Sequence, residues 1–88
     1  MAIIYLPAAL SKKTNATSLR VSATKLSTCL EEVMTIYPDL RPYLFVDKKP
    51  APFIKIFINH ADSDKLDGLD TSISMDDEIQ IVLAIAGG

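Results

Sequence analysis

The sequence predicts a small α+β domain in which one main helix packs on a mixed β-sheet. Four short segments alternate in polarity or are dense in apolar, β-branched and aromatic residues, as strands are, and one segment between them has the apolar period of a helix. The chain has 88 residues, 49% of them hydrophobic. A chain of this size buries about 60–65% of its unfolded surface, which supports one core. We therefore expect one domain over residues 1–88, with residues 84–88 as a flexible C-terminal tail.

The first two strands are predicted at Ala2–Leu6 and over residues 18–23. The first is a short apolar run that meets Pro7, and in the second apolar and polar residues alternate. Residues 11–15 are polar and predict a turn. Together these segments favour an N-terminal hairpin.

A helix is predicted from Leu26 to Tyr37. Its apolar residues recur at the spacing of one helical face, at Leu26, Cys29, Leu30, Val33 and Tyr37. Thr24 or Ser27 is expected to cap its first turn. Pro38 is expected to end it, because the residue before a proline is pushed out of the helical region.

The rest of the chain is predicted to complete the sheet. Residues 39–52 are expected to be irregular, and strands are expected at Phe53–Ile58 and Glu78–Leu83, with turns and a short irregular strand between them. This order of elements is that of the beta-grasp fold. The predicted core comprises Ile4, Leu6, Leu19, Val21, Leu26, Leu30, Val33, Ile56, Ile58, Ile79 and Ile81.

Side chains that carry chemistry are scarce in this sequence. Cys29 is the only cysteine and His60 the only histidine, so one chain cannot supply the repeated ligands of a Cys/His metal site. Cys29 lies on the apolar stripe of the predicted helix and is expected to be a buried, inert thiol. His60 and the acids at positions 62, 64, 67 and 70 are expected to be turn residues. We therefore predict no catalytic side chain and no metal site.

The charge and hydropathy of the chain limit the classes of partner that it is expected to bind. The net charge is -2, and the only basic pairs are Lys12-Lys13 and Lys48-Lys49, too few for a nucleic-acid footprint. The apolar N-terminal run is far shorter than the roughly 20 residues of a membrane span. A lone cysteine fits a reducing compartment. We expect a cytoplasmic protein that binds neither nucleic acid nor membrane.

The end of the chain has an unusual composition. Two of its three glycines are the last two residues, Gly87 and Gly88. Glycine has no side chain, so such a tail can enter a narrow channel and leaves the terminal carboxylate unshielded. That carboxylate has an intrinsic pKa of about 3.3–3.7 and is ionised at neutral pH, which suits attack on the α-phosphorus of ATP in a partner's site. Frayed termini also end in small residues, so the pair gains weight from the fold that precedes it.

The sequence resembles the ubiquitin-like sulfur carriers of the MoaD/ThiS family, which includes the small subunit of molybdopterin synthase, the thiamin carrier and the cysteine-synthesis carrier. The resemblance extends over essentially the whole chain. It is strongest in four runs: Ile58-Asn59, Gly68-Leu69-Asp70-Thr71, Asp77-Glu78-Ile79 and Ala84-Ile85-Ala86-Gly87-Gly88. Two positions depart from the family pattern, since Asp76 stands where glycine is common and Leu83 where proline is. Aspartate tolerates left-handed backbone, so the turn at Asp76 is expected to form.

The resemblance implies a carrier and not an enzyme. In these relatives a ubiquitin-activating-type adenylyltransferase uses ATP to convert the terminal glycine to an acyl-adenylate, and a persulfide or sulfide then displaces AMP to leave a thiocarboxylate. By resemblance, Gly88 would be adenylated and thiolated, and Gly87, Ala86 and Ile85 would form the tail inserted into the partner. The carrier itself would bind no cofactor.

The resemblance also suggests where the sulfur goes. The length of the helix and the Gly-Leu-Asp-Thr run favour the molybdopterin or the cysteine-synthesis branch. The acceptor would then be the large subunit of molybdopterin synthase or a cysteine-synthase-like enzyme. The exposed face of the sheet is expected to contact partners, with Phe53 or Phe57 as an aromatic anchor unless it points into the core.

Two other functions use the same fold. A ubiquitin-like protein modifier would be conjugated to lysines through the same Gly-Gly tail. A non-catalytic ubiquitin-like interaction module would leave the tail idle, and fold alone does not separate these functions.

Overall fold

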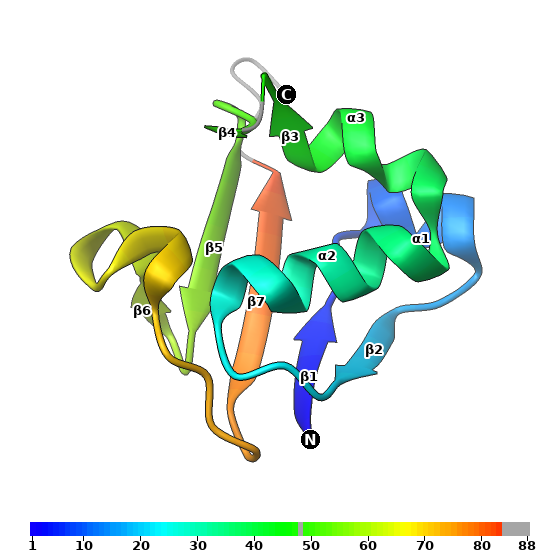
Figure 1. The fold of residues 1–88 in the computed structure, drawn as a ribbon. Helices are drawn as coiled ribbons and strands as arrows, with labels where there is room; N and C mark the ends of the chain where they lie inside the picture. The colour runs from blue at the N-terminus through cyan, green and yellow to red at the C-terminus, as the bar shows by residue number, and fades with distance from the viewer. Residues whose placement is uncertain (48, 84–88) are drawn as a thin grey trace.

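The computed structural model describes residues 1–47 and 49–83 (Figure 1). Its main sheet has five strands in the order β2-β1-β7-β5-β6. Strands β1 and β7 are parallel, and the other neighbouring pairs are antiparallel. The predicted mixed sheet is therefore confirmed. Its strands are β1 (Ala2–Tyr5), β2 (Ser18–Val21), β5 (Ile54–Ile58), β6 (Ala61–Asp62) and β7 (Glu78–Leu83).

The main helix, α2 (Leu26–Ile36), lies across one face of the sheet (Figure 1). Its predicted range is confirmed except that Tyr37 is the residue that ends it, with its N–H donating to the Val33 carbonyl. The predicted capping by Thr24 or Ser27 is wrong. Lys25 precedes the helix, and the Leu26 N–H donates to the carbonyl of Thr71, 2.9 Å away, so a distant loop closes the first turn.

The predicted turn at residues 11–15 is also wrong, because the chain forms a helix, α1 (Ala8–Thr14), between β1 and β2. Two alanines and a leucine open it, and these are good helix formers. Two lysines occupy its last turn, where the helix dipole favours positive charge. Asn15 follows in the left-handed conformation with φ 58°, a common helix end. Leu10 is 1% exposed and joins α1 to the core.

The segment expected to be irregular, residues 39–52, contains regular structure. A 3₁₀ turn, η1 (Pro38–Leu40), leads into one turn of helix, α3 (Arg41–Leu44), and a small hairpin of β3 (Phe45–Val46) and β4 (Lys49–Pro50). Leu40 and Leu44, four residues apart, are fully buried. Their spacing is the helical signal that the prolines of this segment obscured. Two further 3₁₀ turns, η2 (Ser63–Lys65) and η3 (Gly68–Asp70), follow β6.

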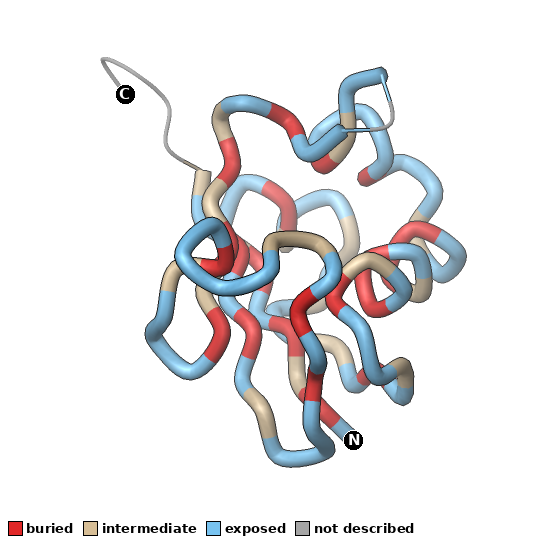
Figure 2. The backbone as a smooth tube through the Cα atoms, turned by 60° about the vertical axis from the view of Figure 1, so that its left-hand side comes forward, coloured by how far each residue is buried: buried red, intermediate tan, exposed pale blue. Residues whose placement is uncertain are grey.

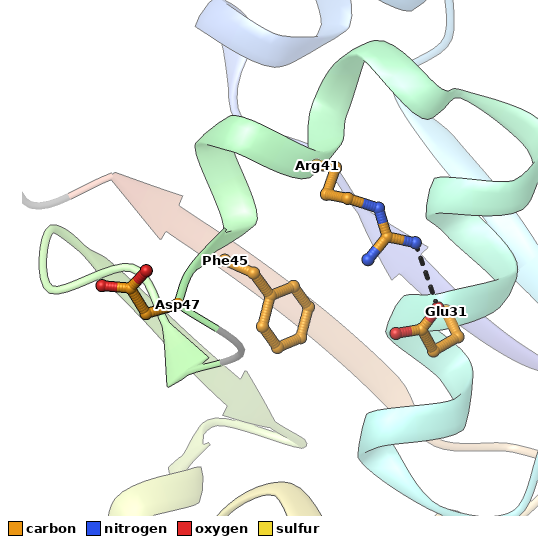
Figure 3. A pocket seen from close by; sticks show the side chains of 4 residues that line it. All are labelled: Glu31, Arg41, Phe45 and Asp47. Carbon is orange, nitrogen blue, oxygen red and sulfur yellow. Dashed lines mark hydrogen bonds and ion pairs between the residues drawn. The ribbon is translucent and has the colours of Figure 1, made fainter.

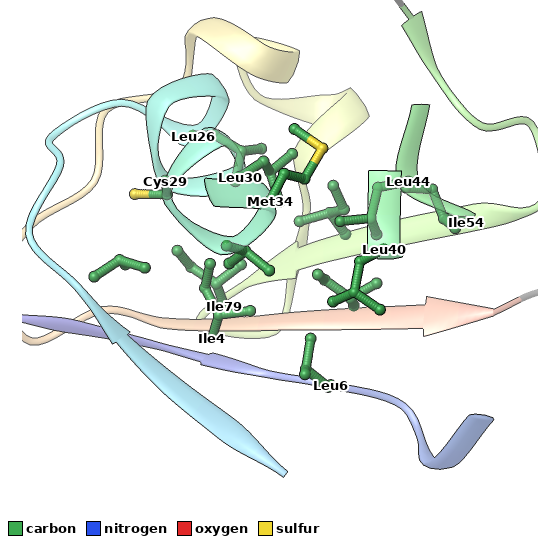
Figure 4. Close-up of a cluster of buried hydrophobic side chains, with 14 of the residues drawn as sticks. Ile4, Leu6, Leu26, Cys29, Leu30, Met34, Leu40, Leu44, Ile54 and Ile79 are labelled. Atoms are coloured by element: carbon green, nitrogen blue, oxygen red, sulfur yellow. The ribbon is translucent and has the colours of Figure 1, made fainter. Parts of the chain in front are cut away.

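The hydrophobic core lies between α2 and the sheet (Figure 4). Every predicted core residue is buried except Leu19, which is only partly buried because β2 is an edge strand. Burial alternates along the strands, as Figure 2 shows for the backbone, so that Ile54, Ile56 and Ile58 face α2. The residues between them, Lys55 and Phe57, face the opposite side of the sheet.

We predict that Leu30→Ala lowers the free energy of unfolding by about 2–5 kcal/mol, because it leaves a cavity under α2. Leu30 is fully buried. The control is Ile36→Ala on the same helix, where the side chain is 54% exposed and the change is expected to stay within about 0.5 kcal/mol. Urea unfolding measures both. Equal effects of the two substitutions would contradict the packing described here.

Candidate functional site

Strand β7 ends at Leu83, directly before the predicted functional tail. Strand β7 lies between β1 and β5, and its last residue, Leu83, pairs with Ile54. The chain is thus held by a ladder up to Leu83, the position where the family pattern often has proline. The predicted tail, residues 84–88, lies outside the described residues, and with it the predicted site residues Ile85, Ala86, Gly87 and Gly88.

The face of the sheet opposite α2 carries two aromatic side chains in one row. Gln80 on β7 pairs with Tyr5 on one side and with Phe57 on the other. Tyr5 is 38% exposed and Phe57 is half-buried. Val82, one step closer to the tail on this face, is 41% exposed. We call Tyr5, Phe57, Gln80 and Val82 the outer patch.

The two candidate aromatic anchors, Phe53 and Phe57, lie in different surroundings. Phe57 lies on the outer patch and can meet a partner. Phe53 is also only partly buried, but it packs against the hydrophobic core. In a regular strand Phe53 and Phe57, four residues apart, would lie on the same face. They differ here because Phe53 lies in the turn that precedes β5, which begins at Ile54 and not at Phe53 as predicted.

A cluster of three charged side chains lies beside the outer patch. The Lys55 ammonium lies 3.2 Å from a carboxylate oxygen of Asp62 and 3.2 Å from one of Asp64. Hydrogen bonds from Lys55 to Asp64 and Asp62 raise the pKa of the Lys55 ammonium. A hydrogen bond from the Asp64 N–H, followed by the Lys55 contact, lowers the pKa of Asp62. From the sequence these acids were expected to be plain turn residues, and the cluster was missed because Lys55 lies in a different element.

Two of the family-like runs meet beside the start of β7, where the β5–β6 turn contacts the turn that precedes β7. The Asn59 side chain donates to Asp77 at 2.8 Å and accepts from the Glu78 N–H at 3.0 Å. Asn59 and His60 both have positive φ, 49° and 73°, as a two-residue hairpin turn requires. His60 is therefore an exposed turn residue, as predicted.

The turn before β7 forms without a glycine. Among the described residues other than glycine, those with positive φ do not include Asp76. This turn therefore does not use the left-handed conformation that we expected at Asp76. Instead Asp77 holds the turn, with its carboxylate accepting from the Ser74 N–H at 2.7 Å and its own N–H donating to the Ser74 carbonyl. This explains how aspartate replaces the usual glycine.

The Gly-Leu-Asp-Thr run supports the start of α2. Gly68 has a φ of 58°, the left-handed region that favours glycine. The Thr71 hydroxyl donates to the Gly68 carbonyl at 2.7 Å and accepts from the Asp67 N–H, while the Thr71 carbonyl accepts from Leu26. The run therefore has a structural role, with no reacting group in it.

Cys29 lies on α2 and is fully buried. Its burial and the nearby Glu32 carboxylate raise the pKa of the thiol to about 11. Glu32 itself accepts hydrogen bonds from the N–H groups of Ser22 and Ala23, which ties α2 to the end of β2. The thiol is thus protonated and enclosed at neutral pH, as predicted for a structural cysteine.

A surface pocket of about 530 Å³ lies between α2 and the β3–β4 hairpin, lined by Glu31, Arg41, Phe45 and Asp47 (Figure 3). The Arg41 guanidinium contacts the Glu31 carboxylate at 3.3 Å, and both side chains are 56% exposed. The residues drawn offer an ion pair, a second carboxylate and an aromatic ring. None of them is a nucleophile paired with a base, so this pocket does not point to a reaction.

Metal ligands and membrane spans can be assessed over the described residues. Among residues 1–47 and 49–83, no group of three or more His, Cys, Asp or Glu side chains is arranged to hold a metal ion. In the same ranges no helix is long and apolar enough to cross a membrane.

Residues 4–88 match the model of the ThiS family. The chain belongs to the ThiS family. A putative sulfur carrier protein of Archaeoglobus fulgidus is 40% identical over 50 residues, which is 57% of this chain and 57% of that protein. The match to this curated relative therefore spans just over half of its length.

Solved structures show the same fold as this ThiS-family chain. A chain in the crystal structure of the Amycolatopsis orientalis BexX/CysO complex superposes with a TM-score of 0.91 and 21% identity, covering 100% of both chains. Small archaeal modifier protein 1 of Methanosarcina acetivorans gives a TM-score of 0.90 and 26% identity, covering 99% of this chain and 95% of its own. The predicted ubiquitin-like beta-grasp fold is confirmed.

We predict that alkaline pH destabilises the protein through Cys29. The thiol ionises near 9.0 in its ordinary state and near 11 in the folded protein. Below pH 9 both states keep the proton, whereas between pH 9 and 11 only the unfolded chain loses it, so stability falls as pH rises. Over this window the free energy of unfolding is expected to fall by about 1–3 kcal/mol more than in Cys29→Ala. Urea unfolding at several pH values measures this, and parallel curves for the two proteins would refute it.

Proposed function

We propose that this ThiS-family chain is a sulfur carrier whose terminal Gly88 carboxylate is activated by a partner enzyme and then carries sulfur as a thiocarboxylate. The family match across residues 4–88, which includes the Gly-Gly end, is the observation that carries the proposal. The similarity to a putative sulfur carrier protein supports it.

The proposed chemistry has two steps. In the active site of a ubiquitin-activating-type adenylyltransferase, a Gly88 carboxylate oxygen attacks the α-phosphorus of ATP and pyrophosphate leaves. Sulfide then attacks the carbonyl carbon, a C–S bond forms, and AMP leaves with the electrons of the broken C–O bond. ATP is bound by the partner, and positioning and charge stabilisation come from the partner's site. Gly87, Ala86 and Ile85 thread the tail into that site.

We propose that the outer patch is the docking surface for this partner. Phe57, Tyr5 and Val82 present apolar surface on the two strands that flank β7 and on β7 itself. Val82 is two residues before the first undescribed tail residue, so a partner that holds the tail also meets this face. Aromatic side chains contribute disproportionately to interface energy. CysO is found in complex with BexX in one similar structure, which supports a carrier that docks on a second protein.

The acceptor of the sulfur is proposed from the family branch. The cysteine-synthesis and molybdopterin branches are the two candidates, with a cysteine-synthase-like enzyme or the large subunit of molybdopterin synthase as acceptor. Assaying sulfur transfer from the loaded carrier to each acceptor enzyme separates them.

A second function, conjugation to lysines of other proteins, is favoured by one observation. Small archaeal modifier protein 1 is 26% identical over nearly the whole chain. The same acyl-adenylate would then react with a lysine amine to form an isopeptide bond. Conjugates that carry Gly88 on target lysines in cells would support a modifier, and a free thiocarboxylate-bearing chain would support a carrier.

We predict that deleting Gly88 abolishes sulfur loading. The terminal carboxylate would then be on Gly87, one residue short of the position at which the partner's site activates it. Gly87→Trp is expected to block loading by its bulk. Both changes are expected to leave the thermal unfolding midpoint nearly unchanged, since the altered residues lie beyond the β7 ladder. Incorporation of radiolabelled sulfide measures loading. Normal sulfur loading of the chain that lacks Gly88 would contradict the proposal.

We predict that Phe57→Ala weakens binding to the adenylyltransferase by about 1–2 kcal/mol, the range of a moderate interface hot spot. Ile36→Ala serves as the control, because Ile36 is an exposed apolar residue on the helical side of the domain. Titration calorimetry gives both dissociation constants. A larger loss for Ile36→Ala than for Phe57→Ala would place the interface on the helical face instead.

A further inference from the structure

We infer that the outer side of α2 and the pocket next to β3 form a second docking surface, which takes a basic segment of a partner protein. We call this surface the α2 groove and define it by Glu31, Glu32, Ile36, Arg41, Phe45 and Asp47. It lies on the helical side of the domain, whereas the outer patch lies on the opposite face of the sheet. The inference goes beyond the proposed function, because it concerns a partner that can bind while the outer patch is occupied.

Two adjoining hollows make up the α2 groove. The pocket of about 530 Å³ lies between α2 and the β3–β4 hairpin, and a second hollow of about 320 Å³ lies along α2 itself. Glu31 lines both, so the two hollows meet at this residue. Ligand pockets commonly enclose about 300–1,000 Å³. Each hollow therefore accepts at least one side chain of the same docked segment.

The α2 groove concentrates negative charge. Glu31, Glu32 and Asp47 contribute three negative charges and Arg41 one positive charge, so the net formal charge of the groove is -2, the same as that of the whole chain. The Glu31 carboxylate is paired with Arg41 at 3.3 Å. Among the described residues, Glu32 and Asp47 form no ion pair. The groove thus presents two carboxylates that a partner's cations can neutralise.

The acids on the face of the outer patch are matched by cations to a greater degree. Arg20 and Glu78 lie on this face in one row, because both pair with Ile3. Asp62 and Asp64 both contact the Lys55 ammonium, at 3.2 Å. Because charge complementarity decides which surface a charged partner approaches, a basic segment is attracted to the helical side of the domain.

The α2 groove also offers apolar contacts. Figure 3 shows the Phe45 ring between Asp47 and the Arg41–Glu31 pair. Ile36, in the second hollow, is 54% exposed. A docked segment can therefore bury apolar surface at both ends of the groove, which charge alone would not reward.

Strand alternation keeps Lys49 off the side of the hairpin that lines the pocket. Phe45 lines the pocket, and Val46, the next residue of β3, lies on the other face of the hairpin. Lys49 on β4 pairs with Val46 and shares that other face. The Lys49 ammonium therefore leaves the Phe45 side open to a partner's cation.

This chemistry fits an arginine side chain with an apolar neighbour. A guanidinium stacks on an aromatic ring and pairs in its own plane with a carboxylate, so one arginine can contact Phe45 and Asp47 together. The chain's own Arg41 already places a guanidinium against Glu31. The apolar neighbour then covers Ile36. An acidic segment would be repelled from the same surface.

The first arm of the test uses a blocked Arg-Leu-Ala-Arg-Leu-Ala peptide as the probe. Its control replaces each arginine with citrulline, which keeps the shape and removes the charge. Amide chemical-shift mapping of the isotope-labelled chain is expected to show saturable shifts at Glu31, Ile36, Phe45 and Asp47. The citrulline peptide is expected to bind about tenfold more weakly, because charge-assisted hydrogen bonds are lost. Shifts centred on the outer patch, no saturable shift, or equal binding of the two peptides would each overturn the inference.

The Glu31→Gln/Asp47→Asn double variant removes two carboxylates of the α2 groove. Asp67→Asn/Asp76→Asn is the matched control, because both acids are exposed, lie outside the groove and change the net charge equally. Circular dichroism melts establish that each variant is folded. Binding of the arginine peptide is expected to weaken about fivefold in the groove variant, the order expected from losing two exposed charge contacts. An equal loss in the control would show attraction by net charge alone and would overturn the site.

The second arm tests whether the two surfaces can be occupied together. Titration calorimetry measures the dissociation constant of the adenylyltransferase for the free chain and for the chain saturated with the arginine peptide. The two values are expected to agree within about twofold, because distant sites without shared contacts act independently. Competition between the peptide and the adenylyltransferase contradicts simultaneous binding. An adenylyltransferase that binds neither form counts against the proposed function instead, and the peptide mapping then decides the α2 groove by itself.

Discussion

The packing of α2 on the central strands is the interaction on which the rest of the structure depends. Strand β7 lies between β1 and β5, and its buried residues Ile79 and Ile81 lie under the same helix as those of its neighbours. Apolar burial of this kind is the main favourable term in folding a small domain. Strand β7 pairs with β1 as far as Gln80 and with β5 as far as Leu83, so the sheet holds the chain up to Leu83. The tail therefore continues from a residue, Leu83, whose position is set by the sheet.

Much of the fold follows from periodicity, and the exceptions have identifiable causes. The stripe from Leu26 to Val33 and the alternation in β5 and β7 are strong signals, because each repeats over several residues of one face. Helix α1 was missed because its seven residues bury only Leu10, so no apolar period is visible. The small hairpin at β3 and β4 was missed because two-residue strands carry no period at all.

Some features of the candidate site can be predicted from neighbouring residues in the sequence, whereas others depend on contacts between residues far apart in it. The Gly-Gly end is readable in the sequence alone, and so is the inert character of Cys29, which follows from its place on the helical stripe. The Lys55 cluster is not readable, since β5 and η2 supply its members and only the folded hairpin brings them together. The role of Asp77 in holding the turn before β7 is likewise a tertiary contact, because its Asn59 partner lies 18 positions away. Phe53 packs against the core because it lies in the turn before β5, whereas Phe57 lies within the strand on its outer face, and the sequence does not mark that boundary.

The central claim is that the terminal carboxylate of Gly88 is the working group of the chain. Intact mass spectrometry after incubation with the adenylyltransferase, ATP and sulfide tests it most directly, with fragmentation to locate the change. We expect a mass increase equal to the replacement of one oxygen by sulfur, confined to the C-terminal peptide. Sulfur found on the peptide that contains Cys29, with an unmodified C-terminal peptide, would contradict it.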